Sequence, residues 1–266
     1  MSTVRWVLID ETEGAACGNG EVLSPLALAR IAEAATMQLN GEVSDEYGGS
    51  VAIRVGAGAA DIQVGERAYI FKPTLPVQGA SAYHDIQGNG VPVSYCAVTT
   101  CGSLNGPDGV SVDATHELGE IRCDEGCNQV ADDGKGTLHM HEICDPVEVQ
   151  TYTKTCGDGT VVCVSNFVLG SWFIPGAPPP YDYMTQAGLP GAVSPPAPMT
   201  IAPGNGGNYQ IVEVAPTSGE NEVFGLTIVG TPKKPDKVAH WSSRLSCRIA
   251  ARSGQKASDP DTTKQP

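Results

Sequence analysis

The chain has 266 residues, of which 41% are hydrophobic, so it is long enough to bury one sizeable core. Its formal net charge of −14 argues against nucleic-acid binding by the main body, and no apolar run of about 18 residues predicts a membrane span. The 32 glycines and 20 prolines, with only 6% aromatic residues, favour turns and short strands over a helical bundle.

The first half of the chain predicts several strands and one long helix. Residues 4–10 predict a strand; their apolar run is short and ends at Asp10, so no signal peptide is expected. Ser24 and Pro25 form a cap-and-first-turn pair that begins a helix, and Asn40-Gly41 ends it. Further strands are expected at 50–58 and 66–73, and on either side of a turn at 87–90.

Residues 112–127 predict a second helix with two different faces. At about 100° per residue, His116, Glu120 and Cys123 fall on one side. The opposite side is apolar and carries Ala114, Leu118 and Ile121. This pattern indicates that one face anchors the helix and the other can hold ligands.

The sequence His-Glu-x-x-Glu lies on this helix and suggests a metal site. His116 and Glu120 are one turn apart and can reach one cation, while Glu117 lies beside that cation. There Glu117 could act as general base on a metal-bound water that attacks a peptide carbonyl, as in His-Glu-x-x-His metallopeptidases. Zn²⁺ is the expected ion, although carboxylate ligands also suit other divalent cations. The alternative is a solvated helix face. Gly119 lowers helix propensity, or it instead permits the close approach of a neighbouring strand or a substrate.

A third metal ligand is expected from the segment that follows a turn at 131–137. This segment offers Asp145, Glu142 and Glu148, and Glu142 is the close competitor of Asp145. The nearby His139 and His141 are expected to lie at the surface or to support the ligands rather than to bind the ion. Because Asp145 precedes Pro146, we expect an extended backbone there that aims the carboxylate inward. A weaker alternative is a Ca²⁺ site formed by the carboxylates of Asp124, Asp132 and Asp133, which precede this segment.

The remainder predicts a strand or hairpin arm at 158–169, a Pro- and Gly-rich irregular loop at 174–208, and strands at 208–214 and 222–230. From Thr231 onward the chain holds 8 of its 16 basic residues and 3 of its 30 acidic ones. A basic helix is expected at 231–252, followed by a disordered tail at 253–266. This helix either docks on an acidic partner or is merely solvated.

Several segments together resemble a family of metallopeptidases from tailed phages and prophages. The resemblance covers roughly residues 24–252 and is most specific in the segments EICDPVE and VSNFV. Its matching positions are His116, Glu117, Glu120, Asp124, Asn128, Glu142, Cys144, Asp145, Pro146, Val147, Val164, Ser165, Asn166, Phe167, Val168, Trp172 and Phe173. The chain departs from the family pattern at Gly119, at Glu125 and in its additional cysteines.

The resemblance implies an α+β, zincin-like single domain over residues 1–230, with a mixed sheet packed on an active-site helix and a strand forming the edge of the cleft. It implies a metallopeptidase-like virion protein, with Tyr83 or His84 contacting the substrate. The alternative on the same scaffold is a catalytically silent capsid or tail component. Other virion proteins are then the expected partners, contacted through the basic C-terminal helix, and a peptide is the substrate if the protein is active.

Nine cysteines without a secretory signal leave at least one unpaired. Cys96 and Cys101 flank a short loop, and Cys156 and Cys163 flank a turn, so each pair is a disulfide candidate. Cys123 could ligate the metal or pair with Cys144. The simpler interpretation of all six is that they are small buried apolar residues.

Overall fold

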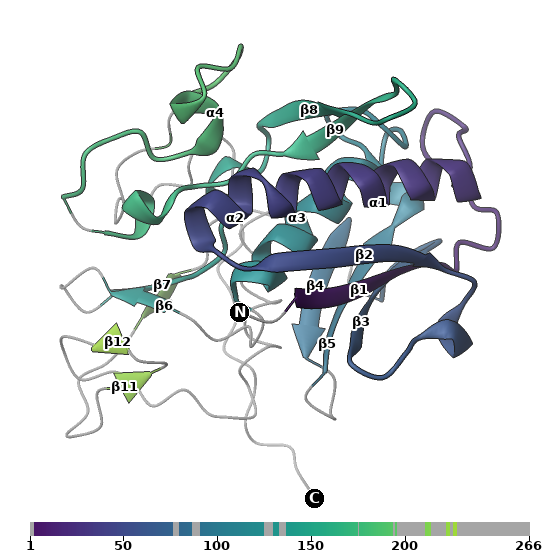
Figure 1. Cartoon of the computed structure of the whole chain (residues 1–266), viewed down its shortest axis with the longest axis horizontal. Coiled ribbons are helices and arrows are strands. Elements are labelled where there is room, and N and C mark those ends of the chain that lie inside the picture. Colours follow the sequence, from purple (N-terminus) through teal and green to yellow (C-terminus); the bar gives the residue numbers. More distant parts are fainter. Residues whose placement is uncertain are drawn as a thin grey trace, which may run out of the picture.

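The computed structural model describes residues 3–76, 80–86, 91–124, 130–132, 137–174, 176–193 and 195, with short strands at 211–213, 222–223 and 226–227. The chain is α+β with a mixed sheet and few helices (Figure 1), as the family resemblance implies. Within these ranges no helix is long and apolar enough to span a bilayer. The predicted helix at 231–252 and the tail at 253–266 lie outside the described residues.

The main sheet has five strands in the order β2-β1-β3-β5-β4. Its strands are β1 (Thr3–Asp10), β2 (Ser50–Gly56), β3 (Glu66–Lys72), β4 (Ala82–Ile86) and β5 (Pro92–Ala97). Neighbouring strands from β2 to β5 are parallel, whereas β4 runs antiparallel to β5 and lies at the end of the strand order. The predicted turn at 87–90 lies outside the described residues, but the strands that flank it are confirmed.

Helix α1 (Pro25–Asn40) begins and ends where the sequence predicts. The Ser24 hydroxyl accepts a hydrogen bond from the Ala27 amide at 3.1 Å, which satisfies a donor of the first turn. At the other end the Asn40 side chain bonds both backbone groups of Val51, which fixes α1 against β2. A short helix α2 (Glu42–Tyr47), which was not predicted from the sequence, continues the chain.

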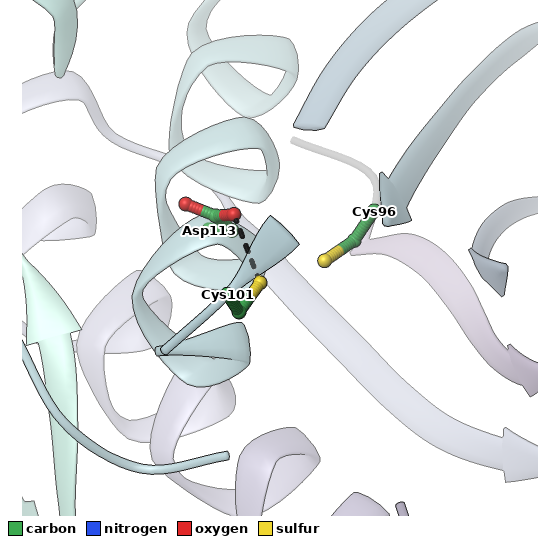
Figure 2. Close-up of side chains that lie close together, drawn as sticks. All are labelled: Cys96, Cys101 and Asp113. Carbon is green, nitrogen blue, oxygen red and sulfur yellow. Dashed lines mark hydrogen bonds between the residues drawn. The ribbon is translucent and has the colours of Figure 1, made fainter. Parts of the chain in front are cut away.

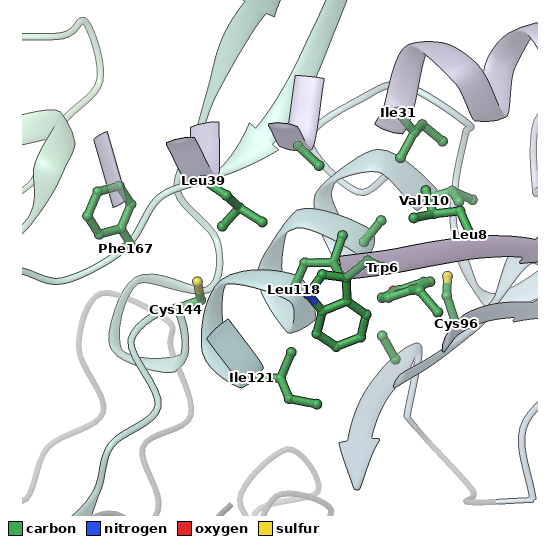
Figure 3. Close-up of a cluster of buried hydrophobic side chains, with 14 of the residues drawn as sticks. Trp6, Leu8, Ile31, Leu39, Cys96, Val110, Leu118, Ile121, Cys144 and Phe167 are labelled. Carbon is green, nitrogen blue, oxygen red and sulfur yellow. The ribbon is translucent and has the colours of Figure 1, made fainter. Parts of the chain in front are cut away.

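Helix α3 (Val110–Cys123) carries the His-Glu-x-x-Glu sequence and packs on the same face of the sheet as α1. Figure 3 shows Leu118 and Ile121 in one buried cluster with Trp6 of β1 and Leu39 of α1. The helix starts two residues earlier and ends four residues earlier than predicted. The expected apolar face is confirmed, because Ala114, Leu118 and Ile121 are at most 1% exposed.

The second half of the chain adds small sheets beside this core. Strands β8 (Thr151–Thr155) and β9 (Val161–Ser165) form an antiparallel hairpin, and β9 packs against α3. Strands β6 (Val130–Asp132), β7 (Thr137–Met140) and β10 (Ile211–Glu213) form a three-stranded sheet. The last two strands, β11 (Glu222–Val223) and β12 (Leu226–Thr227), pair with each other. The predicted loop at 174–208 is irregular where described, apart from the short helix α4 (Tyr183–Gln186).

Candidate metal centre

Three predicted ligands meet at the buried side of α3. His116 Nε2 lies 3.2 Å from Glu120 Oε1 and 3.2 Å from Asp145 Oδ1. These groups lie within 4.8 Å of one another and form a set that could hold a metal ion. Tetrahedral zinc, with bonds of about 2.0–2.1 Å, separates its ligands by roughly 3.3–3.5 Å, so the observed spacing fits a cation with little rearrangement.

The segment 143–145 is held in place by one contact with α3 and one with Val168. The Ile143 carbonyl accepts the amide of Val168 at 2.7 Å, and the Asp145 amide donates to Glu120 Oε1 at 3.2 Å. A short 3-10 helix (Asp145–Val147) begins at the ligand itself. The expectation of an extended backbone at Asp145 is therefore wrong: the proline occupies the first turn of a helix, where its fixed φ is favourable and its missing N–H costs nothing.

Gly119 explains how this segment comes so close to the helix. A Cβ atom at this position would lie 3.2 Å from Cys144 Sγ and 3.7 Å from Ile143 Cδ1. Both neighbours are buried, at 2% and 0% exposure. The glycine therefore permits a close approach, but the approaching residues are those of the segment that carries Asp145 rather than the strand or substrate expected from the sequence.

A second group of side chains adjoins the first. His84 of β4 places Nδ1 2.7 Å from Glu117 Oε2 and 3.6 Å from Glu120 Oε2. Its other nitrogen, Nε2, lies 3.7 Å from Glu142 Oε2. His84, Glu117 and Glu120 also form a set within 4.8 Å that could hold a metal ion. Of the two competing third ligands, Asp145 therefore joins His116, whereas Glu142 lies beside His84.

All six side chains of the two groups are almost completely buried, and His116 is the most exposed at 6%. Burial lowers the pKa of His116, but the charge of Glu120 and hydrogen bonds to Asp145 and Glu120 outweigh it and raise the pKa well above 6.5. The negative carboxylates that stabilise the protonated imidazole would also attract a metal cation.

Tyr83, one of two predicted substrate contacts, points away from this centre. Side chains alternate along a strand, so Tyr83 and His84 lie on opposite faces of β4. The Tyr83 ring packs against Tyr95, its partner across the strands, with ring centroids 5.2 Å apart. Burial, Tyr95 and Asp85 raise the pKa of Tyr83 to about 12. Tyr83 therefore does not join the buried groups, whereas His84 lies among them through its contact with Glu117.

The cysteines form a separate feature further toward the start of α3. Figure 2 shows Cys96 and Cys101 near Asp113, and Cys101 Sγ lies 3.4 Å from Asp113 Oδ2. These groups form a third set that could hold a metal ion, although both thiols also belong to the buried core.

None of the three proposed disulfides is present, since all six candidate cysteines are free in the structure. These are Cys96, Cys101, Cys123, Cys144, Cys156 and Cys163. Cys163 lies opposite Thr153 in the hairpin, and the amide of Cys156 bonds the Thr160 carbonyl. Cys156 and Cys163 are therefore not cross-strand neighbours, which removes the geometric reason for pairing them.

Of the three carboxylates in the alternative Ca²⁺ site, only the side chain of Asp124 is among the described residues. Asp124 is fully buried at the end of α3. Asp133 and the side chain of Asp132 lie outside the described residues. The position Asn128, which the family resemblance includes, also lies outside them.

Sequence reasoning missed two hydroxyl groups near the centre. Ser94 of β5 is directly opposite His84, and Tyr69 of β3 is directly opposite Ser94. Both are 0% exposed, and each hydroxyl has no hydrogen-bond partner in the structure as described. A serine within the otherwise apolar run PVSYCA was the only signal for Ser94.

Comparisons with known proteins give no independent identification. No model of a known protein family matches the chain, and neither the curated proteins nor the solved structures searched give a match. The assignment of function therefore depends on the geometry of the buried His, Glu and Asp side chains.

Proposed function

We propose that the chain is a zinc-dependent, metallopeptidase-like hydrolase with a zincin-like arrangement. The observation that carries the proposal is the meeting of His116 and Glu120 on α3 with Asp145 from a separate segment, at distances that suit one cation. The antiparallel strand β4 at the end of the main sheet, next to α3, supports the same arrangement. An extended peptide can add to such an edge through backbone hydrogen bonds.

The residues of the chain have separate tasks in this proposal. When bound, the cation would act as a Lewis acid that activates water for attack on a peptide carbonyl. Glu117 accepts the proton of that water as general base. His84 Nδ1 positions the Glu117 carboxylate through its 2.7 Å contact with Oε2. The substrate class on this proposal is a peptide, from a virion protein or from the host envelope.

The burial of the centre favours a second candidate function. A catalytic zinc keeps one position open to water or substrate, whereas a structural zinc is closed. Because the ligand side chains are at most 6% exposed, the ion could instead stabilise a virion component that has no activity. The basic C-terminal segment would then contact an acidic capsid or tail partner.

The variant Glu117→Gln distinguishes the two candidates. A hydrolase should cleave members of a mixed peptide pool when loaded with Zn²⁺, and Glu117→Gln should lose cleavage while retaining the ion held by His116. Glu148→Gln, a carboxylate of the same region outside both ligand sets, is the matched control and should cleave normally. A zinc-loaded wild-type protein that cleaves no peptide in the pool would favour the structural role.

A further inference from the structure

The carboxylate of Glu120 faces two imidazoles, one with each oxygen. Oε1 lies 3.2 Å from His116 Nε2, and Oε2 lies 3.6 Å from His84 Nδ1. We propose that Glu120 bridges two divalent cations, the second of which is held by His84 and Glu117. This inference rests on the proposed function, because it adds an ion beside the one assigned to His116, Glu120 and Asp145.

The spacing of the second group suits a cation. His84 Nδ1 lies 2.7 Å from Glu117 Oε2 and 3.6 Å from Glu120 Oε2, and these distances bracket the roughly 3.3 Å between ligands of a tetrahedral ion. Two-metal hydrolases hold their ions about 3.5–4 Å apart, a separation that one bridging carboxylate spans. Glu117 would hold the second ion through Oε2, the oxygen nearest to His84 Nδ1.

The other nitrogen of His84 shows a second feature of metal-binding histidines. Such residues usually direct their remaining ring N–H toward a carboxylate, which orients the ring and fixes its tautomer. Here Nε2 faces Glu142 Oε2 at 3.7 Å, with the His84 side chain 1% and the Glu142 side chain 0% exposed. Glu142 is therefore the carboxylate that orients His84 rather than a ligand of the first ion.

The charge of the proposed ligands also favours a second ion. Metal ligation requires both imidazoles to be neutral and the ligand carboxyl groups to be ionised. The ligands Glu117, Glu120 and Asp145 then contribute three negative charges on side chains at most 1% exposed. A single divalent cation would leave part of this charge uncompensated in a buried site, where unpaired charge is unfavourable.

Buried hydroxyls beside His84 give an independent indication of a ligand. Ser94 lies opposite His84 in the strand pairing and is fully buried, and its hydroxyl has no hydrogen-bond partner in the structure as described. Buried polar groups are normally satisfied, so an unsatisfied hydroxyl at this point indicates an ion or its water. Tyr69 of β3 lies opposite Ser94 in the strand pairing, and its buried hydroxyl likewise has no hydrogen-bond partner in the structure as described.

Metal stoichiometry tests the proposal without requiring activity. The full chain is stripped with chelator, titrated with Zn²⁺, freed of excess ion and analysed for metal content. We expect about two ions per chain in the wild type and about one in both His84→Asn and His116→Asn. His141→Asn is the matched control, because His141 is a largely buried imidazole that packs on Phe173 at 4.4 Å and belongs to neither ligand set, and it should keep both ions.

A second measurement covers the case in which His84→Asn fails to fold. The wild type is loaded with Mn²⁺ and studied by electron paramagnetic resonance. Two Mn²⁺ ions that share a carboxylate interact magnetically, so their spectrum differs from that of isolated Mn²⁺. One ion per chain that is lost in His116→Asn but kept in His84→Asn overturns the second site and leaves the proposed function standing. An uncoupled Mn²⁺ spectrum likewise overturns it, and a wild type that retains no ion overturns both proposals.

Discussion

Replacing Gly119 by alanine tests whether the close approach of α3 and the segment 143–145 positions the metal ligand. Alanine in a helix interior stabilises by about 1 kcal/mol relative to glycine. Here the new methyl group would lie 3.2 Å from Cys144 Sγ, which is buried and has little room to move. Overpacking of this kind costs about 1–3 kcal/mol, so we expect Gly119→Ala to lower the free energy of unfolding by about 1 kcal/mol.

The same contact predicts that the effect changes sign when the sulfur is removed. In a Cys144→Ala background, Gly119→Ala should stabilise by about 0.5–1 kcal/mol, which gives a coupling of about 2 kcal/mol between the two sites. Urea unfolding of the four metal-free proteins measures this cycle. Zn²⁺ titration should also show weaker binding for Gly119→Ala alone, because Asp145 follows Cys144. Equal stabilisation by Gly119→Ala in both backgrounds would refute the reasoning.

Three further predictions follow from burial and hydrogen bonding. Zn²⁺ at about 100 times its dissociation constant should stabilise the protein by about 2.7 kcal/mol. Scanning calorimetry should show this as a rise of several degrees in Tm. The variant His116→Ala should lose this rise, and His141→Ala should keep it. Asn166→Ala should cost about 3 kcal/mol in urea unfolding, because this side chain is 0% exposed and makes three hydrogen bonds; a cost below about 1 kcal/mol would contradict that role. Cys96 and Cys101 should resist alkylation in the native protein and react in urea, as read by mass spectrometry, and rapid native labelling of either would contradict their burial.

The local part of the centre could be predicted from the sequence because helix geometry fixes it. The i and i+4 spacing places His116 and Glu120 on one side of α3 whatever surrounds the helix. The apolar positions Leu118 and Ile121 follow from the same periodicity, and both are in the core. Helix α1 was predictable for a similar reason, since its cap and its apolar stripe are adjacent in the sequence.

The long-range part could not be predicted, because it depends on how separate segments meet. Asp145 and Glu142 are close competitors in the sequence, and only the contacts of the segment 143–145 with Glu120 of α3 and with Val168 separate them. The strand alternation that sends Tyr83 away from the centre and His84 into it requires the register of β4 on β5. Spacing alone also suggested the pair Cys156 and Cys163, which the hairpin register separates.

The glutamate at position 120 gives the two-ion proposal a reason in chemistry. A histidine there would complete His-Glu-x-x-His, but its two nitrogens point in opposite directions, so it could serve the ion beside His116 and not a neighbour. A carboxylate presents two oxygens to ions a short distance apart, and those of Glu120 lie 3.2 Å from His116 Nε2 and 3.6 Å from His84 Nδ1. Glu120→His should therefore retain about one Zn²⁺ per chain where the wild type holds about two, and Glu120→Gln should weaken both sites. If metal analysis finds the same content in Glu120→His and the wild type, Glu120 does not bridge, because the replaced oxygen would then have had no ion to hold.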